Sequence, residues 1–197
     1  MDAHQSHIDK HGARVHVALL RGINVGGKNI VPMKDLAAIF GEAGATGVQT
    51  YIQSGNVVFS ATDEIVNDVP GRVSKELSAR FGLSVPVVMR TAQELRYVAV
   101  NNPFLQADTD QKALHVAFLA SLPGPSAVEA LNPDRSPPDE FSVHGREIYL
   151  RCPNGLARTR LTNAYFDSAL GTTSTVRNWR TVHKLLELAG GDTRPAA

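Results

Sequence analysis

The residues best suited to chemistry lie in a glycine-rich stretch near the start of the chain, which contains Arg21, Asn24, Gly26, Gly27 and Lys28. It follows a nearly continuous apolar run, as expected for a buried strand. Glycines let backbone N–H groups approach an anion closely, and Arg and Lys add positive charge. The stretch therefore predicts an anion-binding loop between a strand and a helix.

Two known phosphate-binding motifs do not fit this stretch. The spacing from Gly22 to Lys28 resembles a P-loop, but Asn29 replaces the Ser or Thr whose hydroxyl would bind Mg²⁺. The second glycine of GxGxxG is also missing, so a P-loop NTPase is rejected. Positive-φ glycines in a tight connection would explain the turn without a ligand. A turn needs none of the side chains of Arg21, Asn24 and Lys28, so ligand contact is favoured.

A second polar group follows at Gln53, Ser54 and Asn56, between two β-rich runs. Their amides and hydroxyl suit recognition of a base edge, a sugar or a carboxamide. They equally suit a turn whose side chains bond the neighbouring backbone, and for these residues the turn is the favoured interpretation.

The last third of the chain is rich in arginine. Residues 151–184 hold six Lys or Arg and one acidic residue, whereas residues 91–150 hold four Lys or Arg and eight Asp or Glu. The polar residues that would bind a ligand here are Arg158, Arg160, Asn163, Arg177, Asn178 and Arg180. Asn178 is expected to cap the last helix, whose free N–H groups attract anions. Alternatively, the arginines pair with the acidic region.

No set of residues has the spacing of a catalytic or metal site. Cys152 is expected to be a buried thiol rather than a nucleophile. His183 is the histidine adjoining the arginines; it could serve as an acid or base, but an exposed side chain is favoured. His4, His7 and His11 could share one helix face and bind a stray metal ion. A mobile tail with incidental histidines is favoured, because nothing nearby would hold the ligands in place, so no metal site and no cofactor are predicted.

Hydrophobic periodicity predicts an α+β fold of two tandem ferredoxin-like βαββαβ units, or α/β plaits, plus a C-terminal helix. A single mixed sheet is the alternative, and the repeat is one of pattern without residue identity. The strands are expected at Val15–Leu20, Val48–Gln53, Asn56–Ser60, Val85–Arg90, Ala113–Ala120, Glu140–Val143, Glu147–Leu150 and Thr173–Val176. The helices are expected from Pro32 to Gly44, before Gly82, after a capping box at Thr91–Glu94, and at Ser126–Leu131, Leu156–Leu170 and Trp179–Ala189.

These elements divide the chain into a tail at 1–13, a first plait-like subdomain at 14–90, a helical linker at 91–112, a second plait-like subdomain with the C-terminal helix at 113–190, and a tail at 191–197. The 197 residues contain 43% hydrophobic and 20% charged side chains, as is ordinary for a globular protein. One cysteine, no signal peptide and no membrane-spanning run predict a cytoplasmic protein without a membrane partner. The sequence does not indicate the oligomeric state.

Three blocks of sequence resemble one bacterial family. They are VALLRGINVGGK at 17–28, YIQSGNVVF at 51–59, and RTRLTN at 158–163 with TVRNWRTV at 175–182. The family is the domain-of-unknown-function 1697 family, and the likeness runs from about Val15 to Leu188. The resemblance implies a stand-alone cytoplasmic α+β protein with the duplicated plait. It implies no catalytic residues.

The first hypothesis is a binding module for an anionic ligand, with a nucleotide or phosphorylated metabolite ranked level with nucleic acid. Plait sheets often bind RNA, but the exposed aromatics of an RNA-binding sheet are missing here, and aromatic content is 6%. The second hypothesis is an enzyme acting on a phosphorylated substrate through Gln53, Ser54 or His183. The third is a structural or regulatory partner protein without a small ligand.

Overall fold

A computed structural model describes residues 12–106 and 108–190. Within these residues the protein is a mixed α+β fold with two four-stranded antiparallel sheets and seven α-helices. Residues 12–96 and 185–190 form one compact unit, and residues 97–184 form the other. Both expected tails fall almost wholly outside the described residues, as do His4, His7 and His11.

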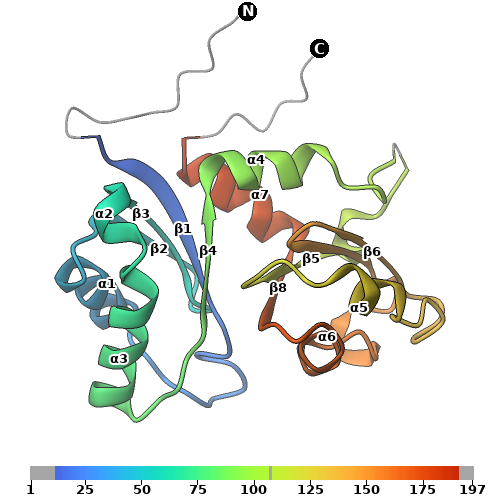
Figure 1. The fold of residues 1–197 in the computed structure, drawn as a ribbon, viewed down its shortest axis with the longest axis horizontal. Helices are drawn as coiled ribbons and strands as arrows, with labels where there is room; N and C mark the ends of the chain where they lie inside the picture. Colours follow the sequence, from blue (N-terminus) through green and yellow to red (C-terminus); the bar gives the residue numbers. More distant parts are fainter. Residues whose placement is uncertain (1–11, 107, 191–197) are drawn as a thin grey trace, which may run out of the picture. The chain divides into compact units, whose positions relative to one another are not determined.

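The first unit contains a sheet in the order β2-β3-β1-β4 (Figure 1). Its elements are β1 (Arg14–Leu20), α1 (Met33–Glu42), β2 (Thr46–Tyr51), β3 (Asn56–Ala61), α2 (Asp63–Val66), α3 (Val69–Phe81) and β4 (Val87–Thr91), followed by α4 (Ala92–Val100). The antiparallel pairing of β2 with β3 confirms the predicted hairpin. The outer position of β4 agrees with Pro86 just before it, because proline cannot donate to a ladder.

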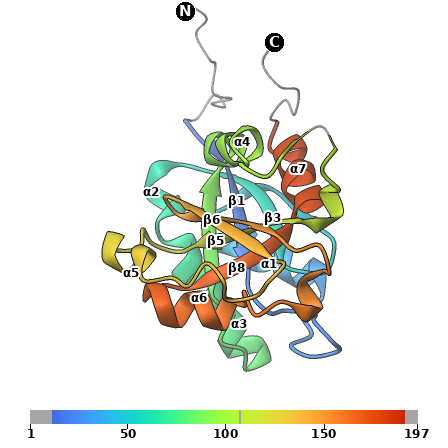
Figure 2. The ribbon, with the colours of Figure 1, turned by 90° about the vertical axis from the view of Figure 1, so that its right-hand side faces the viewer.

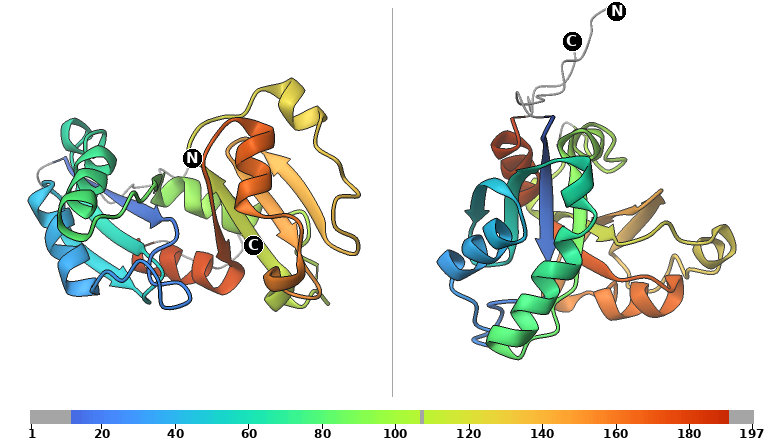
Figure 3. Two further views of the ribbon diagram at one scale, coloured as in Figure 1. Left: turned by 90° about the horizontal axis from the view of Figure 1, so that it is seen from below. Right: turned by 60° about the vertical axis from the view of Figure 1, so that its left-hand side comes forward.

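Helices α1 and α3 cover one face of this sheet (Figures 1 and 3). Alternate residues of β1, Ala18 and Leu20, point into the core that these helices close with Phe40, Val73 and other apolar side chains. The helices form here because their apolar residues recur at three- and four-residue intervals. Gly82 ends α3 at a φ of 67°, and a capping box opens α4, both as predicted.

The second unit contains a sheet in the order β6-β7-β5-β8. Figure 2 labels β5, β6 and β8 of this sheet. Its elements are the 3₁₀-helix η1 (Gln111–Ala113), β5 (Leu114–Leu119), α5 (Pro125–Glu129), β6 (Glu140–His144), β7 (Glu147–Arg151), the 3₁₀-helix η2 (Leu156–Arg158), α6 (Asn163–Leu170) and β8 (Ser174–Asn178). The last helix, α7 (Trp179–Leu188), begins in this unit, and its residues from Leu185 on belong to the first. Phe166 and Leu170 of α6 pack with Ala117, Ile148 and Leu150 of the sheet. The predicted hairpin of β6 and β7 is confirmed.

The predicted helix Leu156–Leu170 is wrong in its first half. The chain makes only one 3₁₀ turn at η2 and then runs extended to α6. Side chains capture the backbone N–H groups that a helix would need: Arg160 N donates to Ser136 Oγ over 2.9 Å. Thr162 then caps α6, its hydroxyl accepting from Tyr165 N over 3.2 Å. The polar residues of this stretch compete with the helix rather than continue it.

One short segment is alike in sequence in the two units, whereas the expectation was a likeness of pattern without residue identity. The strand register matches His16–Leu20, with the sequence HVALL, to His115–Leu119, with the sequence HVAFL. Arg90 on β4 and Arg177 on β8 pair with the valine of these segments. Each guanidinium donates through Nη1 to the carbonyl of its preceding residue, over 2.7 and 2.9 Å respectively.

None of the helices in the described ranges, 12–106 and 108–190, has both the length and the apolar character needed to cross a membrane.

Candidate functional site

Two of the sequence blocks meet at one end of the first sheet. We call residues 21–31 and 52–55 the loop cluster; they follow β1 and form the tip of the β2–β3 hairpin. Leu20 N donates to Gly55 O over 2.7 Å, and Arg21 N donates to Pro86 O over 3.0 Å. These bonds fix the hairpin tip and the chain before β4 to the end of β1, so the cluster is built on the sheet rather than on a free loop.

The glycine-rich stretch itself forms a small hairpin. Val25 and Lys28 make an antiparallel bridge, with Lys28 N donating to Val25 O over 3.0 Å. Gly26 and Gly27 have φ values of 58° and 73°. Positive φ at both central residues is the geometry of a tight two-residue turn that favours glycine. The two glycines therefore have a conformational role in this turn, and they place Lys28 on the arm that returns to α1.

The carboxamide of Asn24 joins the two halves of the loop cluster. Its Oδ1 accepts from Val31 N over 2.8 Å, and its Nδ2 donates to Val31 O and to Gln53 O, both over 2.9 Å. Asn24 adopts a φ of 54°, which asparagine tolerates better than most residues. Asn29, at a φ of 52°, donates through Nδ2 to Gly22 O over 2.8 Å. Both amides hold the loop, so Asn24 acts as its structural link.

The hairpin tip is bonded to itself in a similar way. Asn56 is fully buried, and its Nδ2 donates to Tyr51 O over 3.1 Å and to Ser54 Oγ over 3.0 Å. These bonds match the turn interpretation of Ser54 and Asn56. Gln53 is exposed, and its backbone oxygen receives the Asn24 amide. Of the three predicted polar residues, Gln53 is thus the one with an exposed side chain.

The loop cluster carries positive charge and contains no carboxylate. Arg21 is half-buried, and Lys28 is exposed. Residues 14–34 and 43–62 contain no Asp or Glu. A surface of one charge sign raises the local concentration of the opposite ion. The arrangement suits a phosphate or another anion.

The loop cluster also exposes apolar side chains that sequence reasoning missed. Val25, Ile30 and Ile52 are 60%, 59% and 51% exposed. A branched side chain is expected in the core, and nothing in its sequence neighbourhood indicates otherwise. The structure shows what these residues have in common. Val25 directly follows Asn24, and Ile30 and Ile52 directly precede the two residues that the Asn24 amide bonds.

The predicted arginine cluster of the second unit does not present all its members to solvent. Arg177 is 7% exposed and donates through Nη1 to Thr175 Oγ1 over 2.8 Å as well as to the backbone. Its burial lowers the pKa of the guanidinium to about 10. The members that are exposed are Arg158, Arg160, Asn178 and Arg180. Asn178 caps α7 as predicted, its Oδ1 accepting from Thr181 N over 2.8 Å.

Asn163 takes part in a structural clamp between α6 and β8. The buried Ser174 hydroxyl lies 2.7 Å from Asp167 Oδ1 and 3.2 Å from Asn163 Oδ1. Ser174 N also donates to Asp167 Oδ1 over 2.7 Å. The two α6 side chains thus share one serine.

The other residues considered for chemistry are buried or half-buried. Cys152 is fully buried, as predicted, and burial raises the pKa of its thiol to about 11, which disfavours the thiolate. His183 is half-buried, with its ring edge-on to Trp179 at 4.9 Å. Over residues 12–106 and 108–190, no three His, Cys, Asp or Glu residues group in a way that could hold a metal ion.

Buried histidines should make stability fall in mild acid. Burial lowers the pKa of His16, His115 and His183 from the usual 6.5. As the pH falls below about 6.5, these histidines therefore take up protons in the unfolded chain before they do so in the folded protein. The free energy of unfolding is highest above that pH and decreases as the pH falls from there toward the lowered pKa values of the folded protein. We expect less urea to unfold the protein at pH 5.5 than at pH 7.5. His115→Gln should flatten this dependence, whereas His144→Gln, which removes an exposed ring, should not; equal slopes would contradict the assignment.

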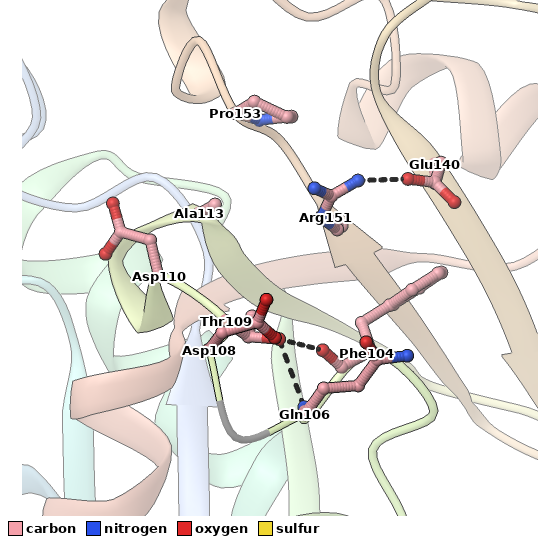
Figure 4. A pocket seen from close by; sticks show the side chains of 9 residues that line it. All are labelled: Phe104, Gln106, Asp108, Thr109, Asp110, Ala113, Glu140, Arg151 and Pro153. Atoms are coloured by element: carbon pink, nitrogen blue, oxygen red, sulfur yellow. Dashed lines mark hydrogen bonds and ion pairs between the residues drawn. The ribbon is translucent and has the colours of Figure 1, made fainter.

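A cavity of about 480 Å³ lies in the second unit, away from the loop cluster in sequence (Figure 4). Its lining is Phe104, Gln106, Asp108, Thr109, Asp110, Ala113, Glu140, Arg151 and Pro153. Glu140 forms an ion pair with Arg151, and Asp110 Oδ1 accepts from Lys112 N over 3.0 Å. Because carboxylates outnumber cations in this wall, the cavity does not suit an anion. The loop cluster, in contrast, contains cations and no carboxylate, so we place the candidate site there.

Comparisons with known proteins give a family and a fold. A family model described as "Protein of unknown function (DUF1697)" matches residues 14–149. The structure is similar to that of the conserved bacterial protein SP0830 from Streptococcus pneumoniae, with a TM-score of 0.66 and 20% sequence identity, over 90% of this chain and 99% of that chain. At this identity the likeness concerns the fold alone. A comparison with curated proteins finds no match.

Proposed function

The chain belongs to the family of proteins of unknown function DUF1697, which assigns it no activity, and we propose that it is a binding module for an anionic, phosphate-bearing ligand. The observation that carries the proposal is the positive charge of the loop cluster: Arg21 and Lys28 stand on a bonded scaffold in a stretch of sequence without Asp or Glu. A loop that is already held by hydrogen bonds loses little conformational entropy when the ligand binds.

The proposal assigns different roles to the residues of the loop cluster. Arg21 and Lys28 contact the anion, and Gln53 adds an exposed carboxamide beside them. Asn24, Ser54 and Asn56 position these side chains through hydrogen bonds to the backbone and to each other. Of the arginines predicted to bind a ligand in the second unit, Arg158, Arg160 and Arg180 have exposed side chains and suit contacts to an anion such as a nucleic acid.

We further propose that each unit is a ferredoxin-like plait and that the chain arose by duplication of one such unit, in a cytoplasmic protein. Both units have the order β-α-β-β-α-β, with the first strand at the third position of the sheet order and the last strand at one edge. The HVALL and HVAFL segments and the paired arginines Arg90 and Arg177 occupy matching register positions, which supports duplication.

A binding measurement with matched variants tests the proposed role. We expect a fluorescent ten-nucleotide RNA at low salt to bind the wild type, and Arg21→Ala/Lys28→Ala to bind at least about tenfold more weakly, because losing charge-assisted contacts to phosphate costs about 1.4 kcal/mol or more. The control Arg72→Ala/Lys75→Ala removes two exposed cations from α3 in the same unit and should leave binding unchanged. If neither RNA, nucleotides nor polyphosphate binds the wild type at low ionic strength, the proposal is wrong.

A further inference from the structure

The three exposed apolar residues of the loop cluster gather around one amide. Val25 follows Asn24 directly, Ile30 precedes Val31, and Ile52 precedes Gln53. The Asn24 carboxamide bonds both Val31 and Gln53 over 2.8–2.9 Å. Because adjacent Cα atoms are about 3.8 Å apart, the three side chains start from backbone positions near a single point. The cluster thus combines an apolar surface with the cations Arg21 and Lys28.

Ile52 adopts a backbone conformation that isoleucine rarely accepts. Its φ is 48°, in the left-handed region, where a β-branched side chain crowds the backbone. Glycine or asparagine would fit this position without that strain. The side chain is 51% exposed, so burial offsets only part of the cost. Strained residues that gain little from packing occur preferentially where a ligand is bound.

The neighbouring chemistry indicates what would cover these side chains. An inorganic phosphate would use only the cations, whereas a nucleotide has both a phosphate and a planar base. Bases pack well between apolar side chains, and their edges hydrogen-bond amides. Gln53, next to Ile52, has an exposed carboxamide that can both donate and accept hydrogen bonds. A purely alkyl ligand would make no use of these atoms, whereas the edge of a base would.

We propose that the loop cluster binds a nucleotide unit, with the phosphate at Arg21 and Lys28 and the base over Val25, Ile30 and Ile52. This inference rests on the proposed anion-binding function and names its ligand class. The unit is either a free nucleotide or part of a single strand, because both offer the same phosphate and base.

The test compares ligands with and without a base on variants of Ile52. The probes are a ten-nucleotide RNA, AMP and inorganic polyphosphate, measured by anisotropy or calorimetry at low salt. We expect Ile52→Gly and Ile52→Asn to weaken RNA or AMP binding about tenfold and to leave polyphosphate binding unchanged, while Ile52→Leu keeps the base-dependent affinity. Leu122→Asn, which removes an exposed leucine from the second unit, serves as the control.

The outcomes separate this inference from the function on which it rests. Both glycine and asparagine variants should melt a few degrees higher than the wild type, since they relieve strain; a lower melting temperature would mean that Ile52 packs the fold and would overturn the inference. Equal effects on RNA and polyphosphate, or no effect on either, would also overturn it while anion binding stands. Failure of all three probes to bind the wild type would instead refute the proposed function. Binding of AMP alone identifies a free nucleotide as the source, and binding of RNA alone identifies a strand.

Discussion

Gly55→Ala is expected to destabilise the protein by about 3 kcal/mol, because its methyl group has no room and its backbone conformation is strained for alanine. A Cβ built at Gly55 would lie 2.7 Å from Leu20 Cβ and 3.0 Å from Ile23 Cγ1. Both neighbours are fully buried, so neither can move away without disturbing the packing of the core. The φ of 74° adds strain for any residue with a Cβ. Urea unfolding followed by circular dichroism measures the loss.

Gly82→Ala separates crowding from backbone strain. Gly82 has a similar φ of 67°, but no atom lies within 4 Å of a Cβ built there. We expect it to cost only about 1 kcal/mol, the price of the left-handed conformation alone. If the two substitutions destabilise the protein equally, glycine is not required at position 55 for the close approach of the hairpin tip to the end of β1.

Removing the Asn24 carboxamide is expected to cost about 2–3 kcal/mol, because three hydrogen bonds are lost and backbone groups of Val31 and Gln53 lose their partner. Asn24→Gly is the informative variant, since glycine tolerates the φ of 54°. Asn24→Asp should be comparably destabilising, because a carboxylate can accept from Val31 N but cannot donate to the two carbonyl oxygens. The same urea unfolding experiment gives both values.

Asn29→Gly is the matched control for Asn24. Asn29 has nearly the same φ, 52°, and its side chain donates a hydrogen bond to Gly22 O. Its loss should cost about 1 kcal/mol. An effect of Asn29→Gly as large as that of Asn24→Gly would show that Asn24 does not join the two halves of the loop cluster.

Most elements of the fold followed from local signals in the sequence. The capping box at Thr91–Glu94, the helix stop at Gly82 and the cap at Asn178 all form as predicted, because each depends on residues within one helical turn. The family resemblance is likewise confirmed by the match over residues 14–149. The first half of the helix predicted from Leu156 does not form: the N–H of Arg160 donates to Ser136, 24 residues away, and the N–H of Leu161 donates to the Thr159 hydroxyl. Periodicity does not reveal these bonds.

The candidate site was less predictable. The sequence placed cations and glycines in one loop, but the roles of its amides depend on partners such as Gln53, brought close only by the hairpin. Arg177 was grouped with exposed arginines, yet its position in β8 buries it. The exposure and strain of Ile52 run against residue propensity, so no pattern could indicate them. The matching HVALL and HVAFL segments became evident once the strand register aligned them.

The dependence of RNA affinity on salt tests the central claim, anion binding at the loop cluster, most directly. Each phosphate contact to a single strand contributes about 0.7 to the slope of log affinity against log salt concentration. We predict that Arg21→Ala/Lys28→Ala reduces the magnitude of the wild-type slope by about 1.4, whereas Arg72→Ala/Lys75→Ala leaves it unchanged. A slope that is the same in the wild type and in the Arg21→Ala/Lys28→Ala protein would show that the ligand's charge is not bound there, and would contradict the account.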